Sequence, residues 1–349
     1  MGNDKSKTYY GILKYNSINI GDEIQSIAAS RFLPHIDYYI NRETIRKWQG
    51  TTSEEKTKLI CNAWWMWCPS SFPPPPTIEP CLISMHICPE ARKHFLKPEI
   101  KNYLLKHGPV GCRDKSTANF LNANKIPAYF SGCLTLTLER IPGLPKKDFI
   151  ITVDLPEHIV RKIRERTNRP VYDLSRFLMP SLTINRLSMA KTMLYLYQSA
   201  HCVISSRLHV AMPCLALQTP VLLIDTNDET LHNDGRYDGL RELCNTISED
   251  DFLASDDAYN LENPPRNKDD YKKIRDELIQ RCFEFTGFDR KDSLFAEYKD
   301  SDTIILNLIS CLRYDYNCIS RFCWYTKGID VVKCILKRVF LKKTQHDLP

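Results

Sequence analysis

The sequence lacks the long apolar run that a membrane-spanning helix needs. Such a helix requires about 20 mostly apolar residues, and no uncharged apolar run of about 18 residues occurs anywhere in the 349 residues. The N-terminal region is polar and has no apolar core of the signal-peptide kind. We therefore expect a cytoplasmic protein whose 14 cysteines are reduced rather than paired in disulfides.

The sequence also lacks the usual marks of nucleotide, nucleic-acid and metal binding. Neither a P-loop nor an intact G-x-G-x-x-G occurs. The 48 basic residues nearly balance the 42 acidic ones, and the net charge of +6 is not gathered in a basic block. Cys61 and Cys68, like Cys81 and Cys88, are too far apart for zinc ligands, which are usually separated by about two to four residues. We therefore expect no nucleic-acid partner, no metal and no cofactor.

Two packed α/β halves are the expected architecture. A single core stops growing at roughly 250–300 residues, and this longer chain is 43% hydrophobic. Apolar runs alternate with helical patterns, which predicts mainly parallel sheets with right-handed crossovers. The pattern restarts after a linker rich in Pro, Gly and Lys at 142–147. Strands are expected at Tyr9–Lys14, Lys58–Trp67, Cys81–Ile87, Ala128–Phe130, Asp148–Val153, Val171–Leu174, His201–Ser205 and Val221–Ile224, and helices at Glu23–Leu33, Arg113–Asn122, Pro156–Arg166, Arg186–Gln198, Arg207–Leu217 and Asp269–Phe285.

The segment from Cys202 to Ile224 carries the strongest chemical signal. A buried strand ends in Ser205 and Ser206, and a helix then begins with Arg207 and His209. A cation at a helix N-terminus opposes the helix dipole and costs about 0.3–1 kcal/mol, so this arrangement indicates an anion site. A serine cap, the first-turn amides and the guanidinium fork would together bind phosphate or carboxylate. The alternative is that Arg207 pairs with an acidic neighbour and that His209 is a core histidine.

Several short motifs occur in a fixed order over roughly the first 245 residues. They are Y-N-S-I-N-I-G-D-E-I-Q-S at 15–26, N-A-W-W at 62–65, G-C-R-D-K-S-T at 111–117, a helix opening with Arg186 and Ala190, S-R-L-H at 206–209, P-C-L-A-L-x-T-P-V at 213–221 and R-Y-x-G-L at 236–240. In order and spacing, these motifs resemble those of the polysaccharide pyruvyl transferases. One departure is Ala63, where we expect glycine.

The resemblance implies two Rossmann-like domains in a GT-B-like arrangement, with phosphoenolpyruvate as the donor substrate. It also implies that a pyruvyl group is transferred to a sugar as a ketal. Arg207, Leu208 and His209 match the donor-binding R-L-H of the family, Arg113 matches an arginine of the first domain, and Arg236 opens R-Y-x-G-L. His209 could protonate the vinyl carbon as a general acid, or it could only hold the phosphate.

The end of the first predicted strand supplies the acceptor side of the expected site. Asn19, Gly21 and Asp22 follow this strand, where open α/β sheets bind ligands. Asp22 could accept a proton from a sugar hydroxyl, or it could cap the next helix in a capping box with Gln25. Trp65 could stack on a sugar face, or it could belong to the core.

Three regions are expected along the chain: an acceptor-side domain at 1–145, a donor-side domain at 146–285 and a basic amphipathic helical extension at 286–349. The helix at 269–285 is expected to brace the first domain. Within the extension, Gly328–Lys343 has an apolar stripe and several lysines. It could lie on anionic lipid at the inner face of the membrane or dock on the protein itself.

These expectations predict a polysaccharide pyruvyl transferase of exopolysaccharide biosynthesis. Its partners would be phosphoenolpyruvate and a glycan or lipid-linked sugar, with a peripheral membrane contact through the C-terminal segment. One alternative is a GT-B-type glycosyltransferase that uses a sugar nucleotide. The other is a non-catalytic protein that binds a glycan or an anion.

Overall fold

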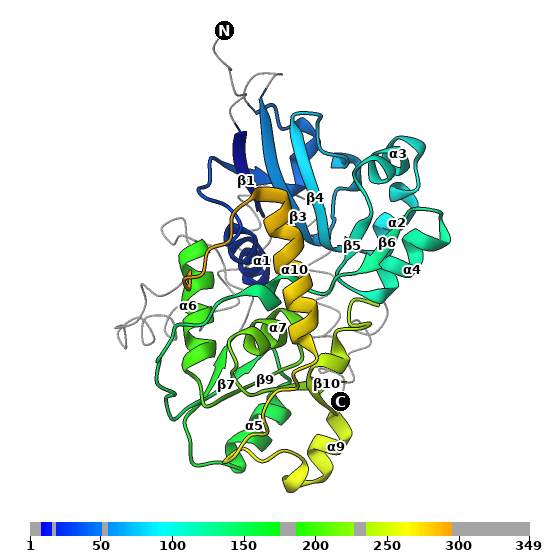
Figure 1. The fold of residues 1–349 in the computed structure, drawn as a ribbon. Helices are drawn as coiled ribbons and strands as arrows, with labels where there is room; N and C mark the ends of the chain where they lie inside the picture. The colour runs from blue at the N-terminus through cyan, green and yellow to red at the C-terminus, as the bar shows by residue number, and fades with distance from the viewer. Residues whose placement is uncertain (1–7, 16–18, 51–54, 175–185, 227–234, 295–349) are drawn as a thin grey trace, which may run out of the picture. The chain divides into compact units, whose positions relative to one another are not determined.

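Two parallel α/β sheets follow one another in the chain (Figure 1). The structure is a computed structural model, and it describes residues 8–15, 19–50, 55–174, 186–226 and 235–294. The predicted fold class, an α/β protein with two Rossmann-like sheets, is confirmed. Nearly all of the predicted extension 286–349, including Gly328–Lys343, lies outside the described residues.

The first sheet has six strands in the order β2-β1-β3-β4-β5-β6, and all of its paired strands run parallel. The long central strands β3 and β4 are apolar and mostly buried, as parallel strands covered on both faces usually are. The strands are β1 (Thr8–Lys14), β2 (Tyr38–Asn41), β3 (Lys56–Trp65), β4 (Ile78–Ile87), β5 (Val110–Cys112) and β6 (Ala128–Phe130).

Helices connect these strands, and two of them begin at polar caps that matter for the site. Asn19 caps the first helix by accepting the Gly21 N–H, and Asp114 caps α4 by accepting the Thr117 N–H. The helical elements are α1 (Ile20–Ser30), η1 (Arg42–Lys47), η2 (Pro69–Ser71), α2 (Pro89–Phe95), α3 (Pro98–His107), α4 (Lys115–Ala123) and η3 (Leu134–Thr137).

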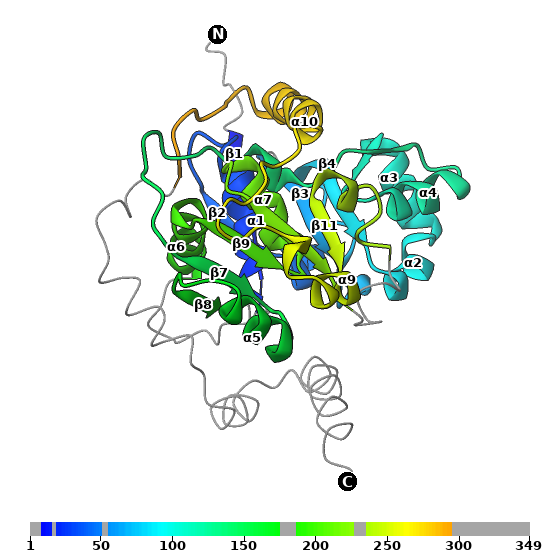
Figure 2. The same ribbon diagram turned by 90° about the horizontal axis from the view of Figure 1, so that it is seen from below.

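The second sheet has five strands in the order β11-β10-β9-β7-β8 (Figure 2). Its strands are β7 (Ile150–Val153), β8 (Val171–Leu174), β9 (Cys202–Ser205), β10 (Val221–Asp225) and β11 (Asn245–Ser248). The helical elements of this part of the chain are α5 (Glu157–Glu165), α6 (Arg186–Ser199), α7 (Leu208–Ala216), η4 (Arg241–Leu243), α9 (Glu249–Ala254), η5 (Asp256–Ala258) and α10 (Tyr271–Thr286). None of the described helices is both long and apolar enough to cross a bilayer.

The two sheets share one strand order. Numbered within its own half, each sheet reads 2-1-3-4-5, and the first sheet adds a sixth strand at its far edge. This is the flavodoxin-like order, in which the chain switches direction between its first and third strands. Ligands of such sheets bind at the carboxyl ends of those two strands. The topology therefore points to the ends of β1 and β3 in one half and of β7 and β9 in the other.

The hydrophobic cores follow the same division. One cluster of buried residues includes Leu59, Trp65 and Phe72 around the first sheet. Another includes Ile150, Ile204 and Phe252 around the second sheet. Burial of such side chains contributes about 1.5–3 kcal/mol each relative to exposure, so each half carries apolar stabilisation of its own.

Helix α10 comes after the second sheet in sequence but contacts elements of the first half. Arg275 donates a 2.8 Å hydrogen bond to Glu139, and Arg281 lies over the ring of Tyr129. This agrees with the expectation that the helix at 269–285 braces the first domain. The predicted boundary at 285 groups α10 with the second domain, and the boundaries themselves stay a prediction.

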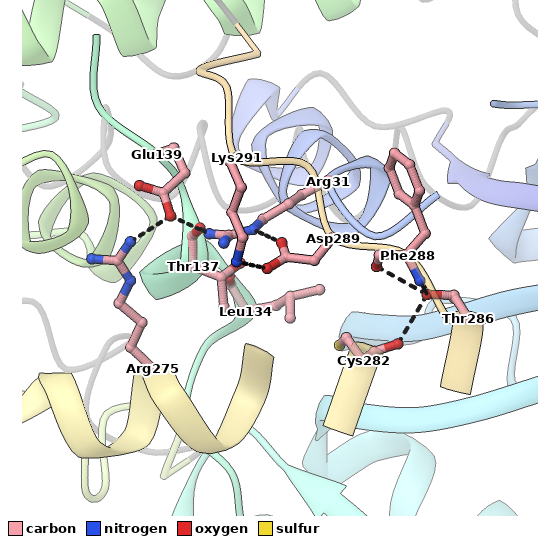
Figure 3. A network of polar contacts seen from close by, with 10 residues as sticks. All are labelled: Arg31, Leu134, Thr137, Glu139, Arg275, Cys282, Thr286, Phe288, Asp289 and Lys291. Carbon is pink, nitrogen blue, oxygen red and sulfur yellow. Dashed lines mark hydrogen bonds and ion pairs between the residues drawn. The ribbon is translucent and has the colours of Figure 1, made fainter. Parts of the chain in front are cut away.

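A polar network fixes the end of this helix (Figure 3). Buried Arg31 donates to Asp289 at 2.6 Å and to the Thr137 carbonyl, and it pairs with Glu139 at 2.8 Å. Glu139 also pairs with Arg275, so one carboxylate joins α1, η3 and α10. Because Arg31 is only 2% exposed, solvent screens these pairs weakly.

Candidate active site

The turn after β9 is built by two serines that hydrogen-bond to the backbone. The Ser205 hydroxyl donates to the Val153 carbonyl at 2.9 Å and accepts the Arg207 N–H at 3.0 Å. The Ser206 hydroxyl donates to the Asp154 carbonyl at 3.1 Å. These bonds fasten the end of β9 to the end of β7, the switch point of the second sheet.

The predicted serine cap of α7 is wrong. The helix begins at Leu208, its N-cap residue is Arg207, and no side chain caps it. Ser206 and Ser205 lie one and two residues before the N-cap position, and both hydroxyls donate to backbone carbonyls at the end of β7 instead. The N-terminus of α7 therefore lacks the side-chain acceptor that the prediction assigned to it.

Arg207 lies beside Asp154 but is only loosely paired with it. Its Nε is 3.7 Å from Asp154 Oδ2, which is too long for a hydrogen bond. The side chain is 14% exposed, and its Nε has no hydrogen-bond acceptor among the described residues. Arg207 therefore does have an acidic neighbour, as the alternative expects, but it does not hydrogen-bond to it through Nε. A buried guanidinium N–H without an acceptor is still available for an oxyanion.

Arg113 connects the first half to the R-L-H segment of the second. It follows β5, and its Nη1 donates to Nε2 of His209 at 3.0 Å. Its backbone N–H donates to the Met85 carbonyl on β4, which fixes the start of the side chain. Arg113 is 2% exposed, and its Nε has no acceptor in the described part of the chain. Arg113 therefore contacts His209, whereas Arg207 precedes His209 by two residues and lies beside Asp154.

The start of α1 packs closely against His209. A Cβ on Gly21 would lie 2.8 Å from Nδ1 and 3.0 Å from Cβ of His209, so a larger side chain would displace the imidazole. The Asn19 side chain orders this turn by accepting the Gly21 N–H at 3.0 Å. The structure thus brings together Asn19 and Gly21 from the first half with His209 from the second.

The predicted capping box of Asp22 and Gln25 is wrong. The helix begins at Ile20, so Asp22 lies within its first turn, and Asn19 is the cap. Gln25 hydrogen-bonds to Cys133 instead. Asp22 is 5% exposed. Although burial lowers the pKa of Arg42, the negative charges of Asp22 and Glu43 raise it more, so Asp22 faces a buried cation.

Trp65 is not positioned to touch a sugar. Its side chain is 0% exposed, its Nε1 donates to the Asn62 carbonyl at 3.1 Å, and its ring packs edge-on against Phe72. A fully buried ring with a satisfied N–H belongs to the core. Leu208 is 5% exposed and contributes apolar packing, whereas Arg236 lies in the half-buried turn before Tyr237.

A charged pair that the sequence did not reveal lies beside Asp22. Glu23 in α1 accepts two hydrogen bonds from Arg186 in α6, at 2.6 and 2.7 Å. Burial raises the pKa of Glu23 to about 7, although the hydrogen bond and charge of Arg186 lower it. The resemblance includes Arg186, but nothing in the sequence pairs it with a residue so distant along the chain.

The R-Y-x-G-L motif forms a turn, residues 235–240, that contacts both halves of the site. The Tyr237 hydroxyl donates to the Ser206 carbonyl at 2.8 Å, next to Arg207. On the other side, the Asp238 carbonyl accepts the Lys115 N–H at 3.0 Å, two residues after Arg113. Gly239 has φ +86, and a Cβ there would lie 3.0 Å from the Lys115 side chain, so the turn requires glycine. We call residues 235–240 the bridging turn.

A fully buried histidine and aspartate hold the segment that carries Arg113. His86 Nδ1 lies 2.7 Å from Asp114 Oδ2, and the other Asp114 oxygen caps α4. Burial alone would raise the pKa of Asp114, but the hydrogen bond and charge of His86 lower it. The residue after Arg113 is therefore anchored to β4 and α4 at once.

The described residues contain no group of three or more His, Cys, Asp or Glu side chains that could hold a metal ion. What the site offers is positive charge, hydrogen-bond donors and one imidazole. The free amides at the start of α7 add a partial positive charge. These features can bind an oxyanion and move a proton beside it.

Comparisons with known proteins agree with the motifs. Residues 84–228 match the family model described as polysaccharide pyruvyl transferase. No curated protein matches the chain. A solved protein of uncharacterised function from Klebsiella pneumoniae aligns with 12% identity and a TM-score of 0.41, covering 69% of this chain and 92% of that one. The UDP-GlcNAc 2-epimerase of Methanocaldococcus jannaschii, solved with UDP-GlcNAc and UDP, aligns with 12% identity and a TM-score of 0.34, covering 86% and 99%.

The family match includes the residues that meet in the site. Arg113, Arg207 and His209 all lie within residues 84–228, whereas Asn19, Gly21 and the bridging turn lie outside them. The resemblance predicted from the motifs is confirmed for this part of the chain, because residues 84–228 match the polysaccharide pyruvyl transferase family model.

Proposed function

We propose that the protein transfers a pyruvyl group from phosphoenolpyruvate to a sugar of a surface-glycan precursor and forms a cyclic ketal. The observation that carries this proposal is the 3.0 Å contact between Arg113 and His209. It joins a buried cation of the first half to the S-R-L-H segment of the second half. The matched family is a family of transferases, which supports an enzymatic role.

The charges of the site suit this donor. Phosphoenolpyruvate carries a carboxylate and a phosphate, and enclosing both without cations would be very costly at low dielectric. Arg113 and Arg207 each offer a buried Nε–H without an acceptor among the described residues. The uncapped N-terminus of α7 offers backbone amides next to them.

The chemistry requires one proton carrier near neutrality. Protonation of the vinyl carbon makes a methyl group and leaves the adjacent carbon electron-poor. One sugar hydroxyl then adds to that carbon and gives its proton to a base. The bond from this carbon to the phosphate oxygen breaks and phosphate leaves. A second sugar hydroxyl adds to the same carbon and closes the ketal, and its proton passes to the released phosphate. His209 is the group of the R-L-H segment that can supply the first proton.

Asp22 is our candidate for the base on the acceptor side. It lies one residue from Gly21, where an added Cβ would be 2.8 Å from Nδ1 of His209. Its carboxylate is nearly buried and faces Arg42. A carboxylate in this position can accept a proton from the attacking hydroxyl. For this reaction the acceptor would be a lipid-linked or free glycan, met in the cytoplasm or at the inner membrane face.

The deciding experiment incubates the purified full-length protein with phosphoenolpyruvate and a panel of glycan acceptors. Release of phosphate that depends on the acceptor, with a matching mass increase of the glycan, is the expected result. Consumption of a sugar nucleotide in its place would identify a glycosyltransferase. Binding of phosphoenolpyruvate without turnover on any acceptor would favour a non-catalytic anion-binding protein.

A further inference from the structure

We propose that Arg113 keeps His209 unprotonated while the site is empty, and that a doubly charged oxyanion binding to Arg113 makes His209 take up a proton. This inference rests on the proposed function only in taking phosphoenolpyruvate as the natural anion. It assigns Arg113 a second role: besides binding the donor, Arg113 controls whether His209 is protonated.

The direction of the hydrogen bond between Arg113 and His209 follows from the two side chains. A guanidinium has five N–H donors, no acceptor and a permanent charge. At 3.0 Å from Arg113 Nη1, His209 Nε2 must therefore accept the hydrogen bond. A ring nitrogen that accepts carries no proton, so the imidazole is neutral and its proton is on Nδ1.

Nδ1 of this tautomer faces the first turn of α1. Gly21 is close enough that a Cβ there would lie 2.8 Å from this atom. Both helix N-termini near the ring, those of α1 and α7, carry positive partial charge. A second proton on His209 would therefore place a cation against Arg113 and against two helix dipoles.

Each described carboxylate on the elements packed around α7 lies beside a cation other than His209. The carboxylate of Glu23 is paired with Arg186, that of Asp154 lies beside Arg207, and that of Asp225 is paired with Arg241. Asp22 acts on Arg42. The titratable groups described on these elements share no single region. They are Asp22 and Glu23 of α1, Arg186, Lys191, Tyr195 and Tyr197 of α6, Asp154 after β7, Cys202 of β9, Asp225 of β10, Arg207 before α7 and Cys214 of α7, whereas η3 carries none.

A bound oxyanion changes both neighbours of Nε2. Arg113 has a buried Nε–H with no acceptor in the described chain, and an oxyanion would accept from it in a charge-assisted bond. Its Nη1 then turns from the imidazole to the ligand. Nε2 loses a donor and gains a negative neighbour, so it binds one proton from solvent and donates it to the anion.

The consequence for the reaction is that binding of the donor substrate causes His209, the general acid, to be protonated. Without an anion, His209 has no proton on the atom that faces the site, so it cannot protonate an incoming sugar or water. With phosphoenolpyruvate bound, one proton stands on Nε2 beside the ligand. The same proton is the one that the vinyl carbon requires.

Sulfate is the probe that tests this proposal, because it is a dianion whose own protonation does not change near neutrality. We would titrate sulfate into the full-length protein at pH 7 by calorimetry, in buffers with different enthalpies of ionisation. The expected result is the uptake of a large fraction of one proton per bound sulfate. His209→Gln should bind sulfate without proton uptake.

A second measurement follows His209 directly by NMR titration of its imidazole in the ligand-free protein. In Arg113→Met, which keeps the length of the side chain but removes its charge, the midpoint should rise by about one pH unit or more. Arg46→Met is the matched control, because Arg46 is an exposed residue paired only on the surface, and it should leave the midpoint unchanged.

Two outcomes would overturn the proposal. One is sulfate binding to the unmodified protein without proton uptake, or no sulfate binding at all. The other is an equal His209 midpoint in the unmodified protein and in folded Arg113→Met. Neither measurement needs turnover, so proton uptake without phosphate release from phosphoenolpyruvate would reject the proposed function and leave this inference standing.

Discussion

Glu23 in α1 and Arg186 in α6 form a two-pronged ion pair between the halves of the chain. Nε and Nη2 of Arg186 donate to the two carboxylate oxygens of Glu23 at 2.6 and 2.7 Å. Glu23 is 5% exposed. Bidentate geometry fixes both side chains, so the pair aligns the first turn of α1, which carries Gly21 and Asp22, with the start of α6.

The pair should make stability depend on pH. The pKa of Glu23 is about 7 in the folded chain, against an ordinary value of 4.5, so folding favours the protonated form. The resulting stabilisation is fully present below about pH 4.5 and is lost as the pH rises through about 7. The free energy of unfolding should fall over this range by on the order of 3 kcal/mol. Chemical denaturation of the unmodified protein and of Glu23→Gln measures the difference, and the variant should lack this slope.

A rise in stability over the same pH range would contradict this prediction. It would mean that the attraction of ionised Glu23 to Arg186 outweighs the cost of burying the charge.

Replacing Arg207 by lysine should weaken donor binding while the fold stays intact. The lysine keeps the charge but loses the fork that can donate two parallel hydrogen bonds to one oxyanion. We expect a loss of about 1.5–3 kcal/mol in the affinity for phosphoenolpyruvate, measured by calorimetry. Arg46→Lys on the surface is the control and should bind normally. Unchanged affinity in Arg207→Lys would remove this residue from the site.

Removing the hydroxyl of Tyr237 should affect stability and donor binding more than removing the hydroxyl of another buried tyrosine. Tyr237→Phe removes the 2.8 Å bond to the Ser206 carbonyl and should lower the free energy of unfolding by about 1 kcal/mol. It should also raise KM for the donor, because the bridging turn then holds the segment before Arg207 less firmly. Tyr259→Phe is the matched control, since its buried hydroxyl has no partner among the described residues. Equal effects of the two substitutions would argue against a role for the bridging turn.

Ala63 should tolerate glycine but not a branched side chain. Its φ is +76°, at a register shift between β3 and β4, and its side chain is fully buried. The left-handed region favours glycine, which explains why we expect glycine at this position. Ala63→Gly should stay within about 1 kcal/mol of the unmodified protein, whereas Ala63→Val should lose more than about 2 kcal/mol. Thermal unfolding of Ala63→Gly and Ala63→Val measures the difference. If Ala63→Val is as stable as the unmodified protein, the positive φ at this position does not restrict the side chain.

Long apolar strands and helices were the part of the fold that the sequence could predict. The runs at Lys58–Trp67 and Cys81–Ile87 correspond to β3 and β4, because a buried parallel strand needs a continuous apolar stretch. Short strands carry too few residues for a dependable periodicity, so the sequence predicts β6 and β8 but not the equally short β2 and β5. The start of α1 was misplaced because Asn19 and Asp22 are both good caps, and only packing selects between them.

The candidate site could be predicted as a set of residues but not as an arrangement. The cation and imidazole at the start of α7 were visible in the sequence, and Arg113 came from the family motif. Their contact joins residues 96 positions apart, and no local pattern encodes such a distance. Trp65 was assigned to the site because its aromatic type suits a sugar, but its N–H finds a partner in its own strand at Asn62.

The return of α10 to the first half has a consequence for synthesis of the protein. Arg31 and Glu139 are translated early, but Arg275 and Asp289, which complete their network, leave the ribosome only after the whole second sheet. Chains generally fold domain by domain as they emerge, at about 5–20 residues per second. Until α10 arrives, buried Arg31 has no Asp289 to pair with. The polar network of the first half is therefore completed only after α10 and Asp289 have been synthesised.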